Sequence, residues 1–467
     1  MESVVKVLEN NQWTLANFQD CELGDKRRTN RLLSVAENML AAPEKSLPAQ
    51  SCDWSDLKAA YRFFDCDQVT FEAICKPHFE QTLACKPGVY LLISDTTDCD
   101  FTRHGATQGL GMLGDGKGRG IQMHPCLMYD LQEKQVVGLA GSLLHYRTLK
   151  KQAETRTQIQ ARRRESCIWG EIVDQVGKAP EGSQWIHVFD RGGDNFEAMC
   201  HVKLSGNDWV IRASHLNRNV QDSAGNPVKL SEMFTNAKTL GTFSMELRST
   251  PKHAARTAHL KVSSCEVIFE APARKSPWLR ACKVKQLHVT VVTAEEIDPP
   301  QGNQPIRWVI LTSLKVKTFD DAWKILGYYE HRWMIEEYNR VCKSGCSIEK
   351  HALRAADRLE PLLGLTSIVA VRLFQLKLIG RNQPEAKASA RVPSSWLTSL
   401  KHLCPRLKIT EMTVYSFFRE LAKLGGFLGR KHDGEPGWIT IWRGYQKLHL
   451  ISIGIAIADS RKGNKCG

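Results

Sequence analysis

Two short apolar runs that both end in aspartate constrain the fold of this chain more than any other feature. The first is Leu91-Leu92-Ile93-Ser94 followed by Asp95, and the second is Ile186-His187-Val188-Phe189 followed by Asp190. Runs of this length without polar alternation indicate strands that are buried on both faces, as in α/β proteins. Open α/β sheets bind ligands at the carboxyl ends of their strands, so both aspartates fall where a site is expected.

Each aspartate also has an ordinary explanation, because a carboxylate after a strand commonly caps the element that follows. For either strand considered alone, this explanation is the better one. Two aspartates at neighbouring strand ends repel each other unless a cation lies between them. Hard oxygen ligands favour Mg²⁺ or Mn²⁺ over zinc, so the pair predicts a divalent metal site.

A third carboxylate comes from a helix predicted from Phe319 to about Ser344. With ~100° per residue, four side chains share a sector of roughly 60° on one face of this helix: Tyr329, Arg332, Glu336 and Lys343. Glu337 points away from that face and is expected to be solvent-facing or ion-paired. A solvated charged stripe is the ordinary explanation of such a face. Beside Asp95 and Asp190, a metal-binding carboxylate flanked by two cations becomes the better one.

The predicted chemistry follows from these residue types. Three carboxylates would hold two divalent ions between them: Asp95, Asp190 and Glu336. Two ions held in this way activate the attacking oxygen and stabilise the leaving oxygen of an in-line phosphoryl transfer. Arg332 and Lys343 would hold a phosphate backbone beside the ions, and Tyr329 would donate a hydrogen bond to a phosphate oxygen.

The charge balance favours a polyanionic partner. Lys plus Arg number 64 against 50 for Asp plus Glu, a net charge of +14, which points to nucleic acid or an anionic membrane surface. No stretch approaches the roughly 18 to 20 uninterrupted apolar residues of a membrane span. Met1 is followed by Glu2 rather than by a basic and then apolar signal region. We therefore expect nucleic acid as the partner, no membrane and a cytoplasmic location.

Two other patterns are weighed and set aside. The 15 cysteines are scattered, with one close pair, Cys342 and Cys346, and we expect reduced thiols rather than a zinc site. Gly109 to Gly114 match the dinucleotide-binding fingerprint, but no apolar strand precedes them and no clear helix follows. The continuation to Gly120 is expected to be a flexible loop, whose Lys117 and Arg119 are weak candidates for DNA contact.

The remaining chain reads as helical at both ends and β-rich in between. Residues to about 75 have a helical pattern, residues 205 to about 312 read as several strands, and a basic helix is expected at roughly Ala153 to Val176. Near the start, three arginines lie about one helical turn or less apart: Arg27, Arg28 and Arg31. They are able to grip phosphates, although a solvated basic face has the same pattern. The aromatic residues of Leu57 to Phe64 are expected to pack inside this region.

The chain resembles the DDE transposases of the bacterial insertion-sequence-four family, in the group of the transposon-five transposase. The matching segments span nearly the whole chain: Leu23–Thr29, Ala60–Phe63, Asp95–Thr97, Asp190–Arg191, Trp308–Ser313, Tyr329–Trp333, Ile335–Glu337, Lys343, Val369–Leu373 and Leu424–Phe427. The spacing of Tyr329, Arg332, Glu336 and Lys343 is the specific part of this likeness.

The resemblance implies an α/β protein: a ribonuclease-H-like catalytic core with a β-rich insertion, flanked by helical N- and C-terminal domains. The expected domains are a DNA-end-binding domain at 1–75, a DDE catalytic domain at 76–375 with an insertion at about 215–305, and a dimerisation domain at 376–467. The helices around Leu424 to Tyr445 would form the interface of a homodimer.

The resemblance also implies a function. A cut-and-paste DNA transposase would bind the terminal inverted repeats of double-stranded transposon DNA, cleave the ends through a hairpin intermediate and join the 3′ ends to target DNA. Asp95, Asp190 and Glu336 would hold Mg²⁺ (or Mn²⁺), two ions per active site. Trp308 would stack on a flipped base, although the sequence alone favours a core Trp on a strand. Arg27, Arg28 and Arg31 would recognise the repeats, and Arg212 would contact DNA near the core.

Two alternatives stay open. A catalytically silent DNA-binding regulator of transposition would keep the fold without the chemistry, but it has no need of all three carboxylates. A same-fold metal-dependent nuclease would use the same three carboxylates without joining DNA. Only Tyr329, Arg332, Lys343 and Trp308 favour hairpin chemistry over simple hydrolysis.

Overall fold

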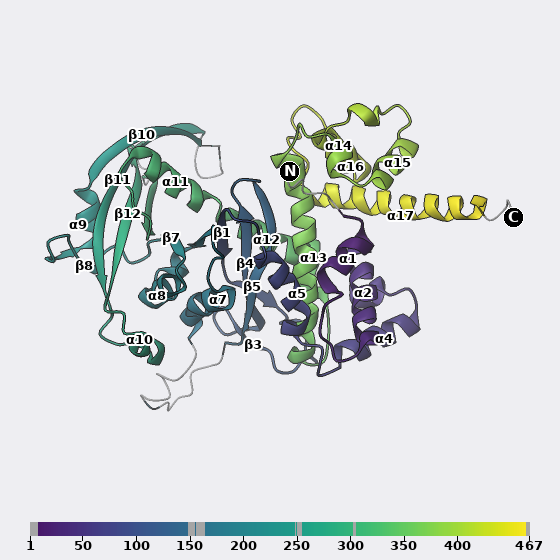
Figure 1. Cartoon of the computed structure of the whole chain (residues 1–467), viewed down its shortest axis with the longest axis horizontal. Helices are drawn as coiled ribbons and strands as arrows, with labels where there is room; N and C mark the ends of the chain where they lie inside the picture. Colours follow the sequence, from purple (N-terminus) through teal and green to yellow (C-terminus); the bar gives the residue numbers. More distant parts are fainter. Residues whose placement is uncertain are drawn as a thin grey trace.

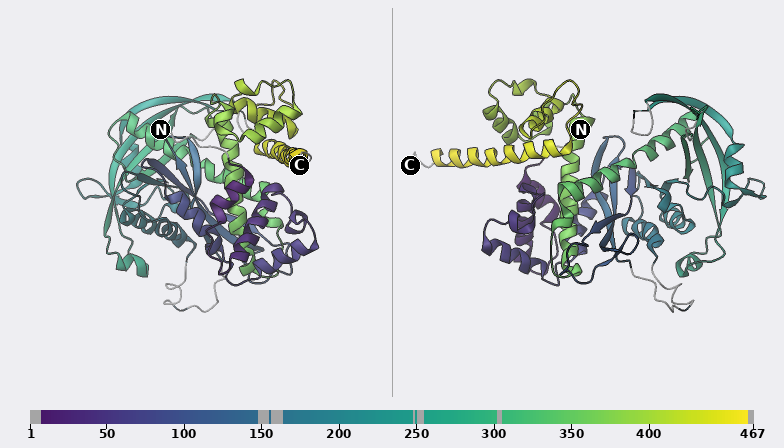
Figure 2. Two further views of the ribbon diagram at one scale, coloured as in Figure 1. Left: turned by 45° about the vertical axis from the view of Figure 1, so that its right-hand side comes forward. Right: turned by 180° about the vertical axis from the view of Figure 1, so that it is seen from behind.

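The helices from both ends of the chain gather on one side of one large sheet (Figure 1). The computed structural model describes residues 8–147, 155, 164–247, 249, 255–301 and 305–463. The purple N-terminal helices and the green and yellow C-terminal helices lie together on one side, and the teal insertion lies on the other (Figure 1, Figure 2). The structure is thus mixed α/β with helical terminal regions, as predicted.

Five strands form the centre of the sheet, in the order β5-β4-β1-β6-β7. They are β1 (Val89–Ser94), β4 (Gly118–Asp130), β5 (Gln135–His145), β6 (Gln184–Phe189) and β7 (Asp208–Arg212). β4 is antiparallel to both β5 and β1, whereas β1, β6 and β7 are parallel. The strands predicted from the apolar runs before Asp95 and Asp190 are confirmed as β1 and β6.

Both faces of this central sheet are buried, which explains the continuous apolar runs. Side chains alternate between the faces: Leu91 and Ile93 belong to one hydrophobic core, and Tyr90 and Leu92 belong to the other. The first core, which we call the α13-side core, contains the terminal helices and α13 (Ala356–Asn382). The second, the α7-side core, contains α7 (Ile168–Val176) and α8 (Phe196–Ser205).

The β-rich insertion extends the same sheet. β13 (Arg307–Thr312) is antiparallel to β7, and β12 (Gln286–Ile297), β11 (Arg256–Glu270) and β10 (Lys238–Leu247) follow in antiparallel order. Two short strands, β8 (Asn219–Gln221) and β9 (Pro227–Lys229), and the helices α9 (Leu230–Thr235) and α10 (Pro277–Ala281) complete it. The strands predicted between residues 205 and 312 are therefore present.

Three of the five N-terminal helices that the structure describes begin at side-chain caps. The five are α1 (Asn10–Phe18), α2 (Lys26–Ala41), α3 (Leu47–Gln50), α4 (Trp54–Phe64) and α5 (Phe71–Leu83). Asp25, Asp53 and Thr70 each accept a backbone N–H in the first turn of α2, α4 and α5 respectively, which fixes where these helices start. Phe63 and Phe64 are buried, so the packing interpretation of the aromatic residues in α4 is confirmed.

The first turn of the described chain is held by the C-terminal helices α14 (Ala388–Arg391), α15 (Ser394–Leu403), α16 (Val414–Leu424) and α17 (Trp438–Gly463). Trp396 donates its indole N–H to Glu9 over 3.1 Å, and the Tyr445 hydroxyl donates to Asn10. Arg372 of α13 donates to the carbonyl oxygen of Leu8. α13 is long and apolar enough to cross a membrane by length and composition, but 89% of its most apolar stretch is buried among the other helices, as in a core helix.

The long helix predicted from Phe319 to about Ser344 is interrupted, so the helical wheel drawn on it is wrong in detail. α11 (Phe319–Glu330) ends in a turn, α12 (Trp333–Arg340) follows, and a π-helical turn covers Val341–Gly345. The break arises because Arg332 N–H donates to the Tyr329 carbonyl oxygen three residues earlier, a tighter spacing than the α-helix has.

The glycine-rich segment is a hairpin and not the flexible loop that was predicted. β3 (Gly111–Leu113) pairs with Gly118–Gly120 at the start of β4, and Gly114 and Gly116 take positive φ in the turn between them. β2 (Thr97–Asp100) pairs with β4 on its other side. A Cβ at Gly120 would lie 2.1 Å from the carbonyl oxygen of Cys99, so only glycine permits this approach. Arg119 is held within the fold, since its guanidinium donates to the Thr107 carbonyl oxygen.

The basic helix predicted at Ala153 to Val176 is confirmed only at its end. A 3-10 turn at Glu165–Cys167 leads into α7, and most of the stretch before Arg164 lies outside the described residues.

Candidate catalytic and DNA-binding site

The alternation of the central strands directs both strand-end aspartates toward the α13-side core. Asp95 follows β1 in step with Leu91 and Ile93, and Asp190 follows β6 in step with Ile186 and Val188. β1 and β6 are in parallel register, with Ile93 opposite Val188. The two aspartates therefore lie at the same level of the sheet, at its carboxyl edge.

α12 brings Glu336 to this edge, because the helix packs against β1. The guanidinium of Arg332 lies between two carboxylates: Nη2 is 2.7 Å from Glu336 Oε1, and Nη1 is 3.6 Å from Asp95 Oδ2. The side chains of Asp95 and Glu336 are 21% and 32% exposed, so the site is partly open to a ligand.

The electrostatics of Asp95 indicate a surplus of negative charge. Burial, together with the nearby Asp190 and Glu336 carboxylates, raises the pKa of Asp95 to about 6, against the lowering effects of the Thr96 N–H and Arg332. Because the carboxyl group remains hard to ionise even beside an arginine, a further cation would stabilise its ionised form. Among the described residues, no three His, Cys, Asp or Glu side chains are grouped closely enough to hold one ion in this arrangement.

Backbone turns fix the orientation of both aspartates. Asp190 Oδ1 accepts the Gly192 N–H over 2.7 Å in a 3-10 turn at Arg191–Gly193, and Asp95 Oδ1 accepts the Thr96 N–H over 2.8 Å. The capping explanation considered for Asp190 therefore also holds. One carboxylate oxygen is occupied by the cap, and the other remains available to a ligand.

Tyr329 lies between two arginines beside the carboxylates. The guanidinium carbon of Arg332 is 5.9 Å from the centre of its ring, and that of Arg212 is 5.8 Å away. Burial lowers the pKa of Arg212, and the neighbouring cations Arg191 and Arg332 lower it further. Several positive charges held this close together favour an anion, such as a phosphate, between them.

Trp308 adjoins this basic group through the backbone. Arg212 donates to the carbonyl oxygen of Arg307 over 2.8 Å, and Trp308 follows on β13 opposite Ala294. The Trp308 side chain is half-buried and packs against the α13-side core. It thus serves in the core and keeps part of its ring exposed.

The acidic partner of one predicted basic residue, Lys343, was not foreseen from the sequence, whereas an ion pair at Glu337 was. Lys343 lies 3.5 Å from Glu349, which also accepts the Asp100 N–H over 3.0 Å. Glu337 is ion-paired with Lys377 of α13 at 2.6 Å, as one of its two expected environments. Glu349 lies six residues beyond Lys343, across a π-helical turn and a 3-10 turn, so no helical spacing could have identified it.

Three aromatic or imidazole side chains near the carboxylates also escaped sequence reasoning: Trp333, His124 and Trp169. Trp333 is 61% exposed, and the Arg332 guanidinium carbon lies 5.3 Å from its ring centre. His124 is fully buried within an apolar strand. A histidine in such a strand is a weak signal, but it is the one that the sequence offered.

The predicted N-terminal arginines lie apart from the carboxylates, on α2 at the other side of the molecule from the insertion (Figure 1). Arg27 pairs with Asp25 and has a 91% exposed side chain. Arg28 donates to the Leu23 carbonyl oxygen over 2.7 Å, and Arg31 pairs with Asp56 at 2.6 Å. Of the three, Arg27 is the most available to a phosphate.

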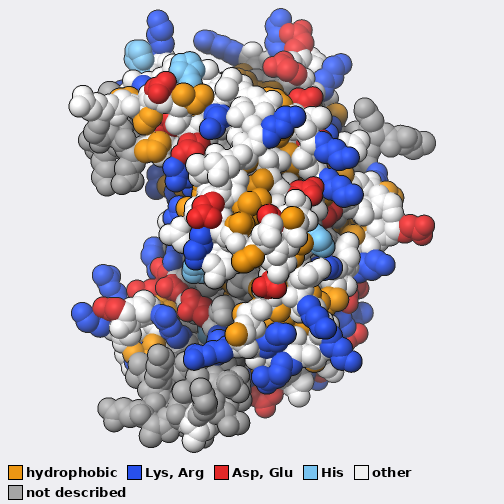
Figure 3. Space-filling view, turned by 90° about the vertical axis from the view of Figure 1, so that its left-hand side faces the viewer, with side chains coloured by type: hydrophobic (Ala, Val, Ile, Leu, Met, Phe, Trp, Pro, Cys, Tyr) orange, Lys and Arg blue, Asp and Glu red, His pale blue; other side chains and the backbone are white. Residues whose placement is uncertain are grey.

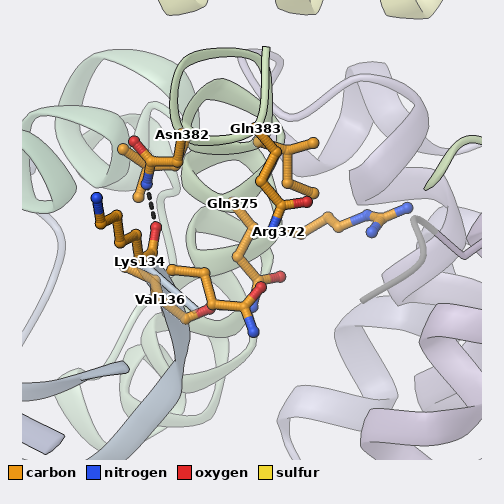
Figure 4. Close-up of a pocket in the computed structure, with 9 residues that line it drawn as sticks. Lys134, Val136, Arg372, Gln375, Asn382 and Gln383 are labelled. Atoms are coloured by element: carbon orange, nitrogen blue, oxygen red, sulfur yellow. Dashed lines mark hydrogen bonds between the residues drawn. The ribbon is translucent and has the colours of Figure 1, made fainter. Parts of the chain in front are cut away.

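A small cavity of about 50 Å³ lies between β5 and α13, away from the carboxylates (Figure 4). Lys134, Val136, Gln375 and Asn382 line it, and Asn382 donates to the Lys134 carbonyl oxygen across it. Its volume suits one or two water molecules rather than a substrate. By contrast, Lys and Arg side chains are spread over the insertion-side face (Figure 3), as a DNA-binding surface requires.

Comparison with known protein families gives two matches, one at each end of the chain. Residues 10–69 match the family described as Transposase DNA-binding, which covers α1 to α4. Residues 368–464 match the Transposase Tn5 dimerisation domain, which covers most of α13 and the helices up to α17. The chain therefore carries a DNA-binding domain before, and a dimerisation domain after, the sequence segment that holds the carboxylates.

Proposed function

We propose that this chain, which its two terminal domains mark as a Tn5-like transposase, is a cut-and-paste enzyme. It binds the terminal inverted repeats of its transposon, cleaves the ends by metal-dependent phosphoryl transfer and joins the 3′ ends to target DNA. The single observation that carries this proposal is the convergence of Asp95, Asp190 and Glu336 beside a group of arginines. A DNA-binding dimer without chemistry has no use for three partly exposed carboxylates at one edge of the sheet.

The carboxylates fit two Mg²⁺ or Mn²⁺ ions by the chemistry of their donor atoms. The raised pKa of Asp95 is the supporting observation, because a cation would offset both the burial and the carboxylate repulsion that raise it. Bound ions would activate the attacking oxygen and stabilise the leaving oxygen. Asp95, Asp190 and Glu336 would hold them, and Arg332 would exchange its carboxylate partners for the phosphate backbone.

The surrounding residues position the DNA. Tyr329, Arg332 and Arg212 form a compact basic group that binds the phosphate at the cleavage point, and Lys343 binds the backbone beside it. Trp308 follows this group on β13 and offers its exposed ring edge to a base displaced from the stack, which stabilises a DNA hairpin. Arg27, Arg28 and Arg31 on α2 contact the inverted repeat.

The arrangement of the central strands supports the proposal of a ribonuclease-H-like core. Three antiparallel strands, β5, β4 and β1, are followed by the parallel β6 and β7, with helices on both faces. Two of the three carboxylates then follow the adjacent parallel strands β1 and β6. The insertion between Asp190 and Glu336 prolongs the sheet beyond β7.

Dimerisation is assigned to α17. Its first turns are covered within the chain, since Trp442 and Tyr445 are buried. Further along, Leu450 and Ile453 are 68% and 44% exposed, on a helix that projects away from the other helices (Figure 1, Figure 2). We place the subunit contact on this projecting part rather than around Leu424 to Tyr445.

One experiment separates this proposal from its alternatives. The protein is mixed with linear DNA that carries its own inverted repeats, in the presence of Mg²⁺. Hairpinned ends together with joined products support a transposase. Cutting without hairpins or joining supports a nuclease of the same fold, and binding without cutting supports a regulator.

A further inference from the structure

We infer that a buried chain of contacts through Thr96, His124 and Trp169, here called the relay, sets the relative position of the Asp95 and Asp190 carboxylates. This inference rests on the proposed metal-dependent function, because it concerns how the two ligands are held ready for the ions. The relay lies on the α7-side of the sheet, behind the carboxylates, and its residues are positioning residues.

The relay begins at Asp95. Asp95 Oδ1 accepts the Thr96 N–H over 2.8 Å, and Thr96 faces the opposite side of the sheet. There its hydroxyl shares a hydrogen bond of 2.8 Å with Nδ1 of His124 on β4. Thr96 thus joins one metal-ligand candidate to a neighbouring strand through its backbone and its side chain together.

The relay continues through two rings. The centres of His124 and Trp169 are 4.6 Å apart with the ring planes at 81°, an edge-to-face contact. Trp169 packs in turn on Phe189, the residue before Asp190, with ring centres 4.9 Å apart. The indole of Trp169, on α7, therefore links His124 in the middle of β4 to the end of β6.

The relay ends at the turn that holds Asp190. A Cβ added to Gly192 would lie 2.8 Å from Trp169 Cζ2 and 3.0 Å from Asp190 Oδ1, so the indole, the glycine and the carboxylate are in close contact. The Gly192 N–H donates to Asp190 Oδ1 over 2.7 Å. A shift of the indole would consequently move the hydrogen bond that orients Asp190.

The identity of His124 supports a positioning role over plain packing. The ring is fully buried, and its Nε2 has no hydrogen-bond partner within the described chain. Native proteins rarely leave a buried polar atom unpaired, and an apolar side chain of similar size would avoid that cost. Burial also lowers the pKa of His124 to about 3, so the ring stays neutral and its bond to Thr96 is constant across physiological pH.

The test measures Mn²⁺ binding to the full-length, DNA-free protein by electron paramagnetic resonance. Thr96→Val keeps the shape of the side chain and removes its hydroxyl, whereas Thr96→Ser keeps the hydroxyl. His124→Phe removes the ring nitrogen. The matched control is His187→Phe, because His187 is equally buried and also adjoins Phe189, with ring centres 5.7 Å apart, but its ring nitrogens are not bonded to Thr96. Thermal unfolding and binding to end DNA in EDTA are recorded for every variant.

We expect Thr96→Val and His124→Phe to weaken Mn²⁺ binding about tenfold, the effect typical of residues that orient metal ligands. The double variant Thr96→Val/His124→Phe should bind Mn²⁺ no more weakly than either single variant, because both substitutions break the same hydrogen bond between Thr96 and His124. Thr96→Ser should restore the affinity. His187→Phe should lower the melting temperature without changing the affinity for Mn²⁺.

The relay is overturned if Thr96→Val binds Mn²⁺ as the unaltered protein does, or if His187→Phe weakens binding as much as His124→Phe. These outcomes leave the proposed function intact when the unaltered protein cuts DNA. If the unaltered protein binds Mn²⁺ without cutting DNA, the proposed function fails while the relay is still decided by the variants. If the unaltered protein binds no Mn²⁺, both fail.

Discussion

Lys377 Nζ lies 2.6 Å from Glu337 Oε2, so the two adjacent glutamates of α12 have different partners. Glu337 is tied to α13, whereas Glu336 meets Arg332 at the carboxyl edge of the sheet. The pair forms a natural internal control, because both residues are of one type on one helix.

We predict that Glu336→Gln abolishes nicking of transposon ends while leaving end binding and the melting temperature nearly unchanged. Glu337→Gln should leave nicking nearly unchanged and lower the melting temperature, because it leaves the buried Lys377 ammonium without its charged partner. The loss of one partner of a charged hydrogen bond costs about 1.5–3 kcal/mol. Nicking assays and thermal unfolding on both variants test this, and nicking that survives in Glu336→Gln contradicts the metal assignment.

Arg332→Gln should bind Mn²⁺ several-fold more tightly than the unaltered protein in the absence of DNA. The reason is that the guanidinium neutralises the Asp95 and Glu336 carboxylates that the ions need. The same variant should nick DNA more slowly, because it loses a phosphate contact. Calorimetric Mn²⁺ titration measures the first effect, with exposed Arg340→Gln on the same helix as the control. Unchanged or weaker Mn²⁺ binding would show that Arg332 does not compete with metal.

Trp308→Ala should keep nicking and impair hairpin formation. Its ring is half-buried, so some loss of stability is also expected, and Trp308→Phe separates the two effects by keeping an aromatic ring. Gel analysis of nicked and hairpinned ends gives the readout. Equal loss at both steps in Trp308→Ala would make Trp308 a core residue alone.

Stability should fall as pH drops below neutral, in part because of His78. Burial lowers the pKa of His78 from 6.5 to about 4, and Nε2 accepts the Leu139 N–H over 3.0 Å. Between pH 6.5 and 4 the unfolded chain binds a proton at His78 and the folded chain does not. The contribution of His78 to the free energy of unfolding is therefore fully present above pH 6.5 and is lost as the pH falls to 4. At roughly 1.4 kcal/mol per pH unit, the loss from this group is about 3 kcal/mol.

His78→Gln should flatten that part of the pH profile, since the amide does not titrate. The measurement is the free energy of unfolding by urea at pH 7 and pH 4, with exposed His432→Gln as the control. If the free energy of unfolding of His78→Gln differs between pH 7 and pH 4 as much as that of the unaltered protein, His78 does not contribute to the pH dependence.

Leu450→Asp should weaken the dimer. The side chain is 68% exposed on the projecting part of α17, and an aspartate there would have to be desolvated in the interface. Leu204→Asp is the matched control, because Leu204 is 56% exposed on α8, outside the dimerisation region. Sedimentation at a series of concentrations decides between them, and equal dimer stability in both variants would move the interface elsewhere.

The sequence predicted the elements that have a strong local period. The apolar runs at β1 and β6 and the residues that follow them were sufficient to predict that Asp95 and Asp190 lie together, because the strand period and the parallel register determine it. The choice of Glu336 over Glu337 agrees with the different contacts of the two side chains. The resemblance to Tn5-like transposases is confirmed by the two terminal domains.

What the sequence did not predict depends on contacts between distant segments. A helical wheel assumes a constant angle per residue. It therefore could not predict the break at His331 and Arg332 or the π-helical turn after Arg340. The partner of Lys343, Glu349, depends on that irregular backbone. Residues Gly111–Leu113 form a strand because they pair with the start of β4, and the local sequence pattern did not predict this pairing.

The continuity of the sheet has a mechanical consequence. β10, β11, β12, β13, β7 and β6 are hydrogen-bonded in this order within one sheet, and Asp190 directly follows β6. A hinge between the insertion and the centre would require those hydrogen bonds to break. A force on the insertion, as when DNA is bent across it, is therefore transmitted through the sheet to the position of the Asp190 carboxylate.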